Sequence, residues 1–150
     1  MFNKGKVLGI DYGHVRVGVA VSDEERSIAF GRESIKNKSN RVLLGKLRDI
    51  CKKENIKKII IGLPLNMDGA NTSQTNEVKK FGESLQNTLK IPVIYHDERL
   101  TSVESCGILT ALGYKGKQKR EEKDKIAASI ILQNYLDLKG KKGQNGVKAE

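Results

Sequence analysis

Three acidic residues stand where their carboxylates could act together. Asp11 ends an apolar strand just before a glycine turn, Glu98 follows a second strand, and Asp124 opens the last helix. Oxygen ligands select a hard cation, Mg²⁺ or Mn²⁺, and phosphoryl chemistry commonly uses two such ions about 4 Å apart. The pattern therefore favours metal-dependent hydrolysis of phosphodiester bonds, with these acids as catalytic residues and metal ligands.

Asp124 has the most informative position of the three. Helical spacing places it on one face with Ala127, Ala128 and Ile131, so its carboxylate points toward the sheet. Burial would raise its pKa, and a shared divalent cation would offset that cost. Two structural alternatives stay open. Asp124 could instead interact with the helix macrodipole, and Asp11 could stabilise its own turn.

Other chemistries find little support in the sequence. His14 and His96 are the only histidines, neither has an evident nucleophile, and we expect a turn residue and a strand-end residue respectively. Gly9 and Gly13 precede a strand rather than a helix, which argues against a dinucleotide site.

Apolar periodicity predicts the elements that would position the acids. Three extended segments joined by short turns indicate an antiparallel meander. Helical patterns and short β-branched runs then alternate. The expected elements are strands at 6–11, 15–22 and 27–34, a helix at about 40–55, a strand at 57–62, a loop to 73, a second helix, a strand at 91–96 and two closing helices, the last at about 123–138.

Strand-helix-strand connections of these lengths require parallel neighbours. We therefore expect an α/β fold whose mixed five-stranded sheet combines the three-strand meander with two parallel strands and is flanked by helices on both faces. Thr101 and Glu104 have the spacing of a capping box, which puts Asp97 and Glu98 at a strand-to-helix junction.

Length and composition bound the class of protein. The chain has 150 residues, so we expect one domain at 1–138 and a basic, disordered tail at 139–150. Cys51 and Cys106 form no close pair and are predicted to be buried free thiols, which suits a reducing cytoplasm. Neither a secretory leader nor a membrane-length apolar run is evident, so we expect a cytoplasmic protein with no membrane partner.

The charge balance points to a polyanionic partner. Lys and Arg total 28 against 18 Asp and Glu, a formal net charge of +10. Part of this excess lies in a glycine-containing segment at 113–125, where we place Lys119 and Arg120 among the substrate-binding residues. The segment is predicted to be a mobile basic loop that enters the last helix, and binding should be sensitive to salt.

Four motifs in order resemble the YqgF (RuvX) family of bacterial ribonuclease H-like proteins. They are Gly9-Ile-Asp-Tyr-Gly13 with Arg16-Val-Gly-Val-Ala-Val-Ser-Asp23, Gly62-Leu-Pro-Leu-Asn-Met-Asp-Gly69, Asp97-Glu-Arg-Leu-Thr101, and Asp124 followed by Ala127-Ala128. The resemblance covers residues from about 7 to 137. It implies a ribonuclease H-like fold and an acidic active site at Asp11, Glu98 and Asp124.

The same resemblance implies a function. It suggests a hydrolase, an endonuclease that processes the 5′ end of precursor 16S ribosomal RNA in ribosome biogenesis, with structured RNA as substrate and a ribosomal subunit as a partner. Two alternatives remain, a resolvase of four-way DNA junctions and a non-catalytic RNA or ribosome binder. A resolvase should be a two-fold dimer, but the sequence fixes neither a monomer nor a homodimer.

Several residue roles stay open. If the strand at 57–62 lies between those ending at Asp11 and Asp97, glutamate's longer reach favours Glu98 as the ligand, although Asp97 could serve. Arg16 and Arg99 are candidate phosphate clamps or solvated ion pairs. The loop around Asn66 either contacts substrate or forms an Asx-type turn at Asp68.

Overall fold

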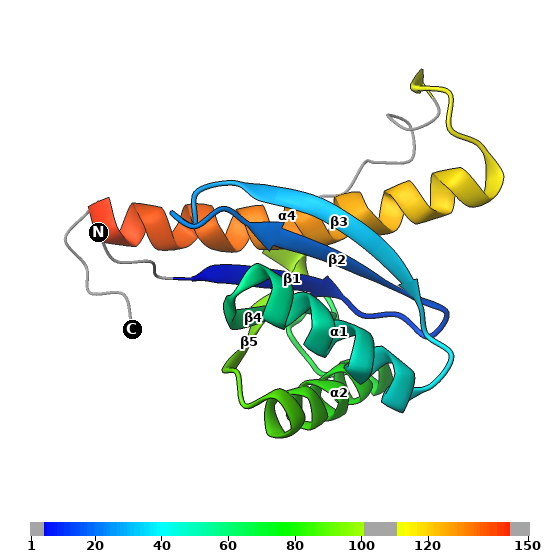
Figure 1. The fold of residues 1–150 in the computed structure, drawn as a ribbon, viewed down its shortest axis with the longest axis horizontal. Helices are drawn as coiled ribbons and strands as arrows, with labels where there is room; N and C mark the ends of the chain where they lie inside the picture. The colour runs from blue at the N-terminus through cyan, green and yellow to red at the C-terminus, as the bar shows by residue number, and fades with distance from the viewer. Residues whose placement is uncertain (1–4, 101–110, 145–150) are drawn as a thin grey trace.

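The computed structural model describes residues 5–100 and 111–144. Its elements follow one another as the alternating pattern predicts (Figure 1). They are β1 (Lys6–Asp11), β2 (Arg16–Ser22), β3 (Ala29–Lys36), α1 (Asn40–Glu54), β4 (Ile56–Leu63), α2 (Ser73–Leu89), β5 (Val93–Asp97), the short 3-10 helix η1 (Glu98–Leu100) and α4 (Gly116–Gln144).

The five strands form one mixed sheet in the order β3-β2-β1-β4-β5. The β1–β2 and β2–β3 pairs are antiparallel, whereas β1–β4 and β4–β5 are parallel, which confirms the predicted meander and parallel pair. Parallel neighbours bring their carboxyl ends to the same edge of a sheet. Asp11 and Asp97 therefore end at one edge, with β4 between them.

Two helices cover one face of this sheet. α1 and α2 pack against alternate residues of the strands, and the shared core includes Leu8, Ile10, Val19, Ile59, Ile61, Leu43, Leu47 and Leu85. The ends of α1 follow capping rules, because the Ser39 side chain accepts a hydrogen bond from the Val42 N–H and Asn55 closes the helix at φ +56°. Cys51 is buried in this core, as expected, and burial raises the pKa of its thiol to about 12.

The long helix α4 covers the opposite face (Figure 1). Its residues Ala128, Ile131 and Leu132 are buried against Val7, Ala20 and Ile60. The helix approaches closely because the sheet presents glycines to it. A Cβ at Gly18 would overlap the backbone carbonyl of Asp124, and one at Gly9 would lie 2.7 Å from Leu132 Cβ. Gly18 thus allows the backbone at Asp124 to lie directly on β2.

The last helix differs from the prediction at both ends. It begins at Gly116 rather than near 123, and it continues to Gln144 rather than ending near 138. The basic segment from Gly116 is therefore helix rather than a loop, and residues 139–144 are helical rather than a disordered tail. Lys, Arg, Glu and Gln have high helix propensity, which outweighs the scattered glycines here.

Some expectations lie outside the described residues. These are the capping box at Thr101 and Glu104, the burial of Cys106, the first closing helix over most of its length and the tail from 145. In the part of the chain that is described, no helix is both long and apolar enough to cross a membrane.

Candidate active site

The structure brings the acids Asp11 and Glu98 to the same edge of the sheet. Asp11 ends β1, and Glu98 begins η1 directly after β5. β4 lies between these strands, and Gly62 is its residue at this level, since Ile10 pairs with Ile61 and Gly62 pairs with His96. An added Cβ at Gly62 would lie 2.9 Å from Glu98 Oε2 and 3.0 Å from its Cγ. The glycine therefore leaves the space in which the Glu98 side chain lies over β4.

Burial and neighbouring carboxylates raise the pKa values of Asp11 and Glu98 at this edge of the sheet. Burial raises the pKa of Asp11 to about 7, and the negative charges of Glu98 and then Asp124 add to the shift. Burial also raises the pKa of Glu98, with a further contribution from the charge of Asp97. Among the described residues, no hydrogen bond reaches the Asp11 carboxylate, which argues against a turn-stabilising role for this residue.

Asp124 lies in the third turn of α4, because the helix begins at Gly116. The macrodipole effect falls off within the first turn of a helix, so that alternative does not explain its position. Instead its Oδ2 accepts hydrogen bonds from Arg16 Nε at 2.6 Å and from Ser34 Oγ at 2.8 Å. Arg16 is thus in a largely shielded ion pair with Asp124, and a role for it in binding phosphate stays a prediction.

Ser34 is a hydrogen-bond partner of Asp124 that the sequence analysis missed. It lies on β3 directly opposite Gly18, the residue that admits the α4 backbone. A short polar side chain on β3 opposite a glycine of β2 is the signal that could have identified it. That signal becomes readable only once the strand register is known.

Asp97 and Arg99 form a separate pair. Arg99 Nε and Nη2 donate to the Asp97 carboxylate at 2.7 to 3.1 Å, and Arg99 Nη1 donates to the Met67 carbonyl at 3.1 Å. These hydrogen bonds lower the pKa of Asp97. Asp97 is thus engaged by Arg99, whereas Glu98 interacts with Asp11, which favours Glu98 over Asp97 as the second acid.

The loop after β4 forms the predicted turn. The Ala70 N–H donates to Asp68 Oδ1 at 2.9 Å, and the Asn66 N–H donates to the Ala70 carbonyl at 3.0 Å. This is the Asx-type alternative. Asn66 itself is exposed on this loop, and Arg99 reaches the same loop through Met67.

The other residues singled out from the sequence are two basic residues of α4 and the two histidines. Lys119 and Arg120 lie in the first turns of α4, and Arg120 lines a groove together with Arg16. His96 is buried with its Nε2 2.7 Å from Asn134 Oδ1, as expected for a strand-end residue. His14 is an exposed turn residue whose Nε2 lies 3.2 Å from Glu77 Oε1.

The carboxylates at this edge of the sheet are suitable ligands for a divalent cation, but their present arrangement does not form a complete metal site. Asp11 and Glu98 supply carboxylate oxygens, which suit a hard cation, and a cation would offset the burial and the repulsion that raise the pKa of Asp11. Within the described ranges, however, no three Asp, Glu, His or Cys side chains come close enough together to hold a metal ion. Asp124 would complete the set by exchanging Arg16 for the cation.

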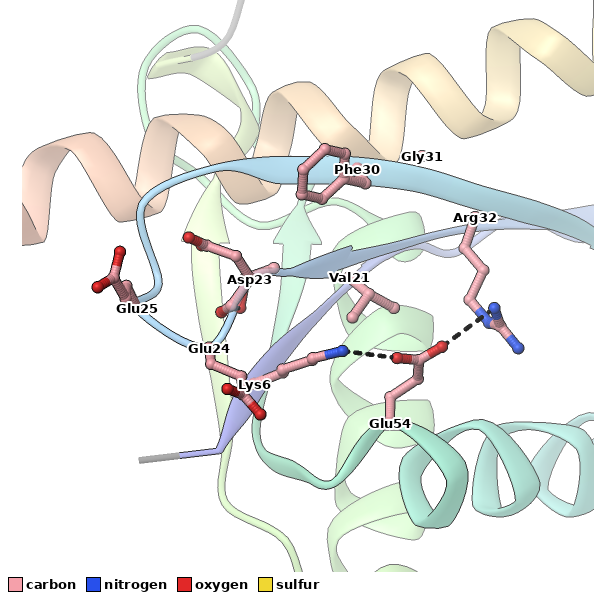
Figure 2. A pocket seen from close by; sticks show the side chains of 10 residues that line it. Lys6, Val21, Asp23, Glu24, Glu25, Phe30, Gly31, Arg32 and Glu54 are labelled. Carbon is pink, nitrogen blue, oxygen red and sulfur yellow. Dashed lines mark hydrogen bonds and ion pairs between the residues drawn. The ribbon is translucent and has the colours of Figure 1, made fainter. Parts of the chain in front are cut away.

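A cavity of about 630 Å³ lies at the opposite end of the sheet (Figure 2). It is lined by the start of β1, the end of β2 and the end of α1. Lys6 Nζ lies 3.0 Å from Glu54 Oε1, and Arg32 Nη1 lies 3.2 Å from Glu54 Oε2. Its cations are thus paired, and it is separated from the acids by the length of β1.

Comparison with known proteins identifies the family. A family model described as RuvX, Holliday junction resolvase, matches residues 5–138. A protein of Rickettsia conorii named as a candidate pre-16S rRNA nuclease is 39% identical over 131 residues, which are 87% of this chain and 85% of that protein. A protein of the same name from Caldanaerobacter subterraneus subsp. tengcongensis is 42% identical over 133 residues, 88% and 96% of the two chains.

Solved structures support the fold. RuvC of T. thermophilus in complex with a Holliday junction superimposes with a TM-score of 0.53 at 14% identity, over 95% of this chain and 96% of that one. The yeast mitochondrial resolvase Ydc2 gives a TM-score of 0.51 at 14% identity, over 91% and 79%. These neighbours confirm the ribonuclease H-like fold. The family-model match over residues 5–138 and the relatives at 39% and 42% identity confirm the resemblance seen in the motifs and show that the chain belongs to the RuvX family.

Proposed function

We propose that this protein is a metal-dependent endonuclease that hydrolyses phosphodiester bonds in structured RNA, at the 5′ end of precursor 16S rRNA. The observation that carries the proposal is that Asp11 and Glu98 meet at one edge of the sheet, where Gly62 leaves space for the Glu98 side chain, and that burial and the charges of Glu98 and Asp124 raise the pKa of Asp11 there. Membership of a nuclease family and the names of the curated relatives support it. In this proposal Asp11, Glu98 and Asp124 are the catalytic residues, and a ribosomal subunit is the assembly on which the RNA is cut.

The residues of the chain divide the work. Mg²⁺ or Mn²⁺, held by Asp11, Glu98 and Asp124, would activate water and stabilise the leaving oxygen of the phosphodiester. Burial and the neighbouring charges raise the pKa of Asp11 to about 7, and a bound cation would favour its ionised form. Arg16 and Arg99 flank the acids and present guanidinium groups of the kind that bind phosphate oxygens in pairs. Asn66, Lys119 and Arg120 complete the proposed substrate-binding set.

A second candidate function is the resolution of four-way DNA junctions. The description of the family model favours it. Symmetric cleavage of a junction needs two active sites related by a two-fold axis, so a resolvase should be a homodimer. The mass of the protein in solution separates the candidates, because a strict monomer argues against symmetric resolution.

Cleavage assays test the proposal directly. The substrates are a precursor 16S rRNA 5′ segment and a four-way DNA junction, each with Mg²⁺, with Mn²⁺ and with chelator. The variants are Asp11→Asn, Glu98→Gln and Asp97→Asn, with Asp49→Asn as a control because Asp49 is an exposed acid on α1.

We expect RNA cleavage that Asp11→Asn, Glu98→Gln and chelation abolish and that Asp49→Asn leaves unchanged. A larger loss from Asp97→Asn than from Glu98→Gln would reverse the assignment of the second acid. Cleavage of the junction alone would replace the RNA substrate with DNA. RNA binding without cleavage under any condition would show a non-catalytic binder instead.

A further inference from the structure

A strongly basic groove opens next to the acidic edge of the sheet. It encloses about 630 Å³ between the β1–β2 turn, the segment after β3 and the start of α4. Five cationic residues and one carboxylate line it, Arg16, Lys36, Lys38, Lys117, Arg120 and Glu121. We call this surface the basic groove. Its net charge makes it a site for an anion rather than for a neutral ligand.

One wall of the basic groove leads along α4 to the active site. Lys117, Arg120 and Asp124 have spacings of three, four and seven residues, so they lie on one face of the helix. Seven residues of helix span about 10 Å. The groove therefore begins at the first turn of α4, and Asp124 lies one turn beyond Arg120 on the same face of the helix. Arg16 lines the groove and also donates a hydrogen bond to Asp124, so it connects the groove to the acidic site.

The other wall is fixed by hydrogen bonds between the β1–β2 turn and the end of β3. The Asn37 N–H donates to the Val15 carbonyl at 2.9 Å, and Asn37 Nδ2 donates to the Gly13 carbonyl at 2.9 Å. Arg16 and Lys36 are directly opposite each other on β2 and β3. Like charges at such a pair destabilise a sheet, and an anion bound between them would remove that repulsion.

Apart from Arg16, which is paired with Asp124, the cations of the groove are available for a ligand. In the part of the chain that is described, no carboxylate forms an ion pair with Lys36, Lys38, Lys117 or Arg120. The cavity at the other end of the sheet provides the contrast (Figure 2). There Lys6 and Arg32 both bind Glu54, and Asp23, Glu24 and Glu25 add negative charge.

We propose that the basic groove binds the phosphodiester backbone of the nucleic-acid substrate on its way to the acids, with Lys36, Lys38, Lys117 and Arg120 as phosphate contacts. The proposal rests on the proposed nuclease function for its ligand. Lys36, Lys38 and Lys117 are new to the substrate-binding set. Lys36 ends β3 and Lys38 follows it, in a part of the chain that no sequence motif marks. The N-terminus of α4, which opens at Gly116, adds positive potential at the same place.

Binding without cleavage tests this site. A labelled RNA hairpin is titrated in chelator with the wild-type chain, with the variant K36A/K38A/K117A, and with the control K46A/K52A/K80A. The control removes the same charge from exposed lysines of α1 and α2, on the other face of the sheet. Each titration is repeated from about 50 to 300 mM salt, a range over which phosphate contacts weaken strongly.

We expect the groove variant to lose about tenfold or more in affinity at 100 mM salt. The slope of log affinity against log salt should fall by roughly 2 to 3, as expected for three lost phosphate contacts. The control should lose less than about threefold, from net charge alone. Equal losses in the two triple variants, or an unchanged slope in the groove variant, would overturn the proposal.

The single variant Lys38→Ala is a control for the case in which the triple variant fails to fold. It should lower the salt slope by about one while the melting temperature stays unchanged. The binding assay is independent of catalysis. If Asp11→Asn loses cleavage but the groove variant binds RNA like the wild type, the nuclease function stands and the groove proposal is wrong. If the groove variant loses binding but Asp11→Asn cleaves like the wild type, the groove stands and the proposed catalytic role of Asp11 is wrong.

Discussion

Arg16 Nε lies 2.6 Å from Asp124 Oδ2, and this ion pair joins β2 to α4 beside the proposed catalytic acids. The two residues are 108 positions apart in the chain. Both side chains are largely shielded, with 29% and 17% of their surfaces exposed. The guanidinium therefore occupies an oxygen of the carboxylate that the proposed cation also needs.

Replacing Arg16 with alanine should move two measurements in opposite directions. Without a cation, Asp124 loses its charged partner in a shielded position, so the free energy of unfolding should fall by about 1 to 3 kcal/mol. With Mn²⁺, the carboxylate is free to bind the ion, so the rise in melting temperature on adding Mn²⁺ should exceed that of the wild type. Urea unfolding in chelator and thermal melts with Mn²⁺ measure the two effects.

Ser34→Ala is the control, because it removes the other donor to Asp124 Oδ2 but no charge. It should cost about 1 kcal/mol and change the Mn²⁺ response less than Arg16→Ala does. A smaller Mn²⁺ response in Arg16→Ala than in the wild type would show that Arg16 assists cation binding rather than competing with it.

The raised pKa of Asp11 predicts a pH-dependent gain in stability for Asp11→Asn. In the folded chain this pKa is about 7, whereas the ordinary value is 3.8. Between these values the unfolded chain releases the proton that the folded chain keeps, so the wild type loses stability as pH rises toward and through 7. The loss amounts to at most about 4 kcal/mol.

Asparagine does not titrate, so the stability advantage of Asp11→Asn over the wild type should be small at pH 4.5 and largest at pH 8. Urea unfolding in chelator at both pH values measures it. If Asp11→Asn is no more stable than the wild type at pH 8, the carboxylate is not destabilised by its surroundings, and the electrostatic basis of the site is wrong.

Removing divalent cations should lower the melting temperature of the wild-type protein at pH 8. Binding to the folded state at ten times the dissociation constant adds about 1.4 kcal/mol, which corresponds to roughly 3 to 5 °C for a chain of this size. At pH 5.5 the effect should shrink, because the cation must then displace the proton from Asp11. Thermal melts with Mn²⁺ and with chelator at the two pH values measure it.

Asp11→Asn and Glu98→Gln should abolish this cation response, whereas Asp49→Asn should retain it. Asp49 is exposed on α1, on the opposite face from α4. A full response in Asp11→Asn would place the cation elsewhere on the protein.

The sequence predicts the strands and the acids at their ends because these follow from local patterns. Asp11 precedes a glycine turn, and Ile59, Ile60 and Ile61 form a short β-branched run that can only be a buried strand. The contact between Arg16 and Asp124 has no such local signal. It depends on the placement of α4 across the sheet, which close packing at Gly18 determines.

The extent of α4 shows how local signals can mislead. Gly113 and Gly116 suggested a loop, but the residues that follow are mostly Lys, Arg, Glu and Gln, which favour helix. Packing of the later turns against the sheet then stabilises the whole helix. The basic residues are consequently held on a rigid face that leads to Asp124.

Gly62→Ala should disable the site while leaving most of the fold intact. The added Cβ would lie 2.9 Å from Glu98 Oε2 and 2.7 Å from Ile131 Cδ1, so the Glu98 side chain must shift from its place over β4. Overpacking of this kind costs about 1 to 3 kcal/mol. We expect RNA cleavage to fall at least tenfold, because displacing a positioned catalytic group by even 1 Å costs about a hundredfold in rate.

Gly45→Ala is the matched control, because Gly45 lies within α1 and an added Cβ there would meet no atom within 4 Å. Alanine is the better helix former, so this variant should gain about 0.5 to 1 kcal/mol and cleave RNA at the wild-type rate. Urea unfolding and the cleavage assay, run on both variants, separate lost stability from lost positioning. If Gly62→Ala cleaves RNA as fast as Gly45→Ala, the position of the Glu98 carboxylate over β4 does not affect the reaction. The assignment of Glu98 as the second catalytic acid would then be wrong.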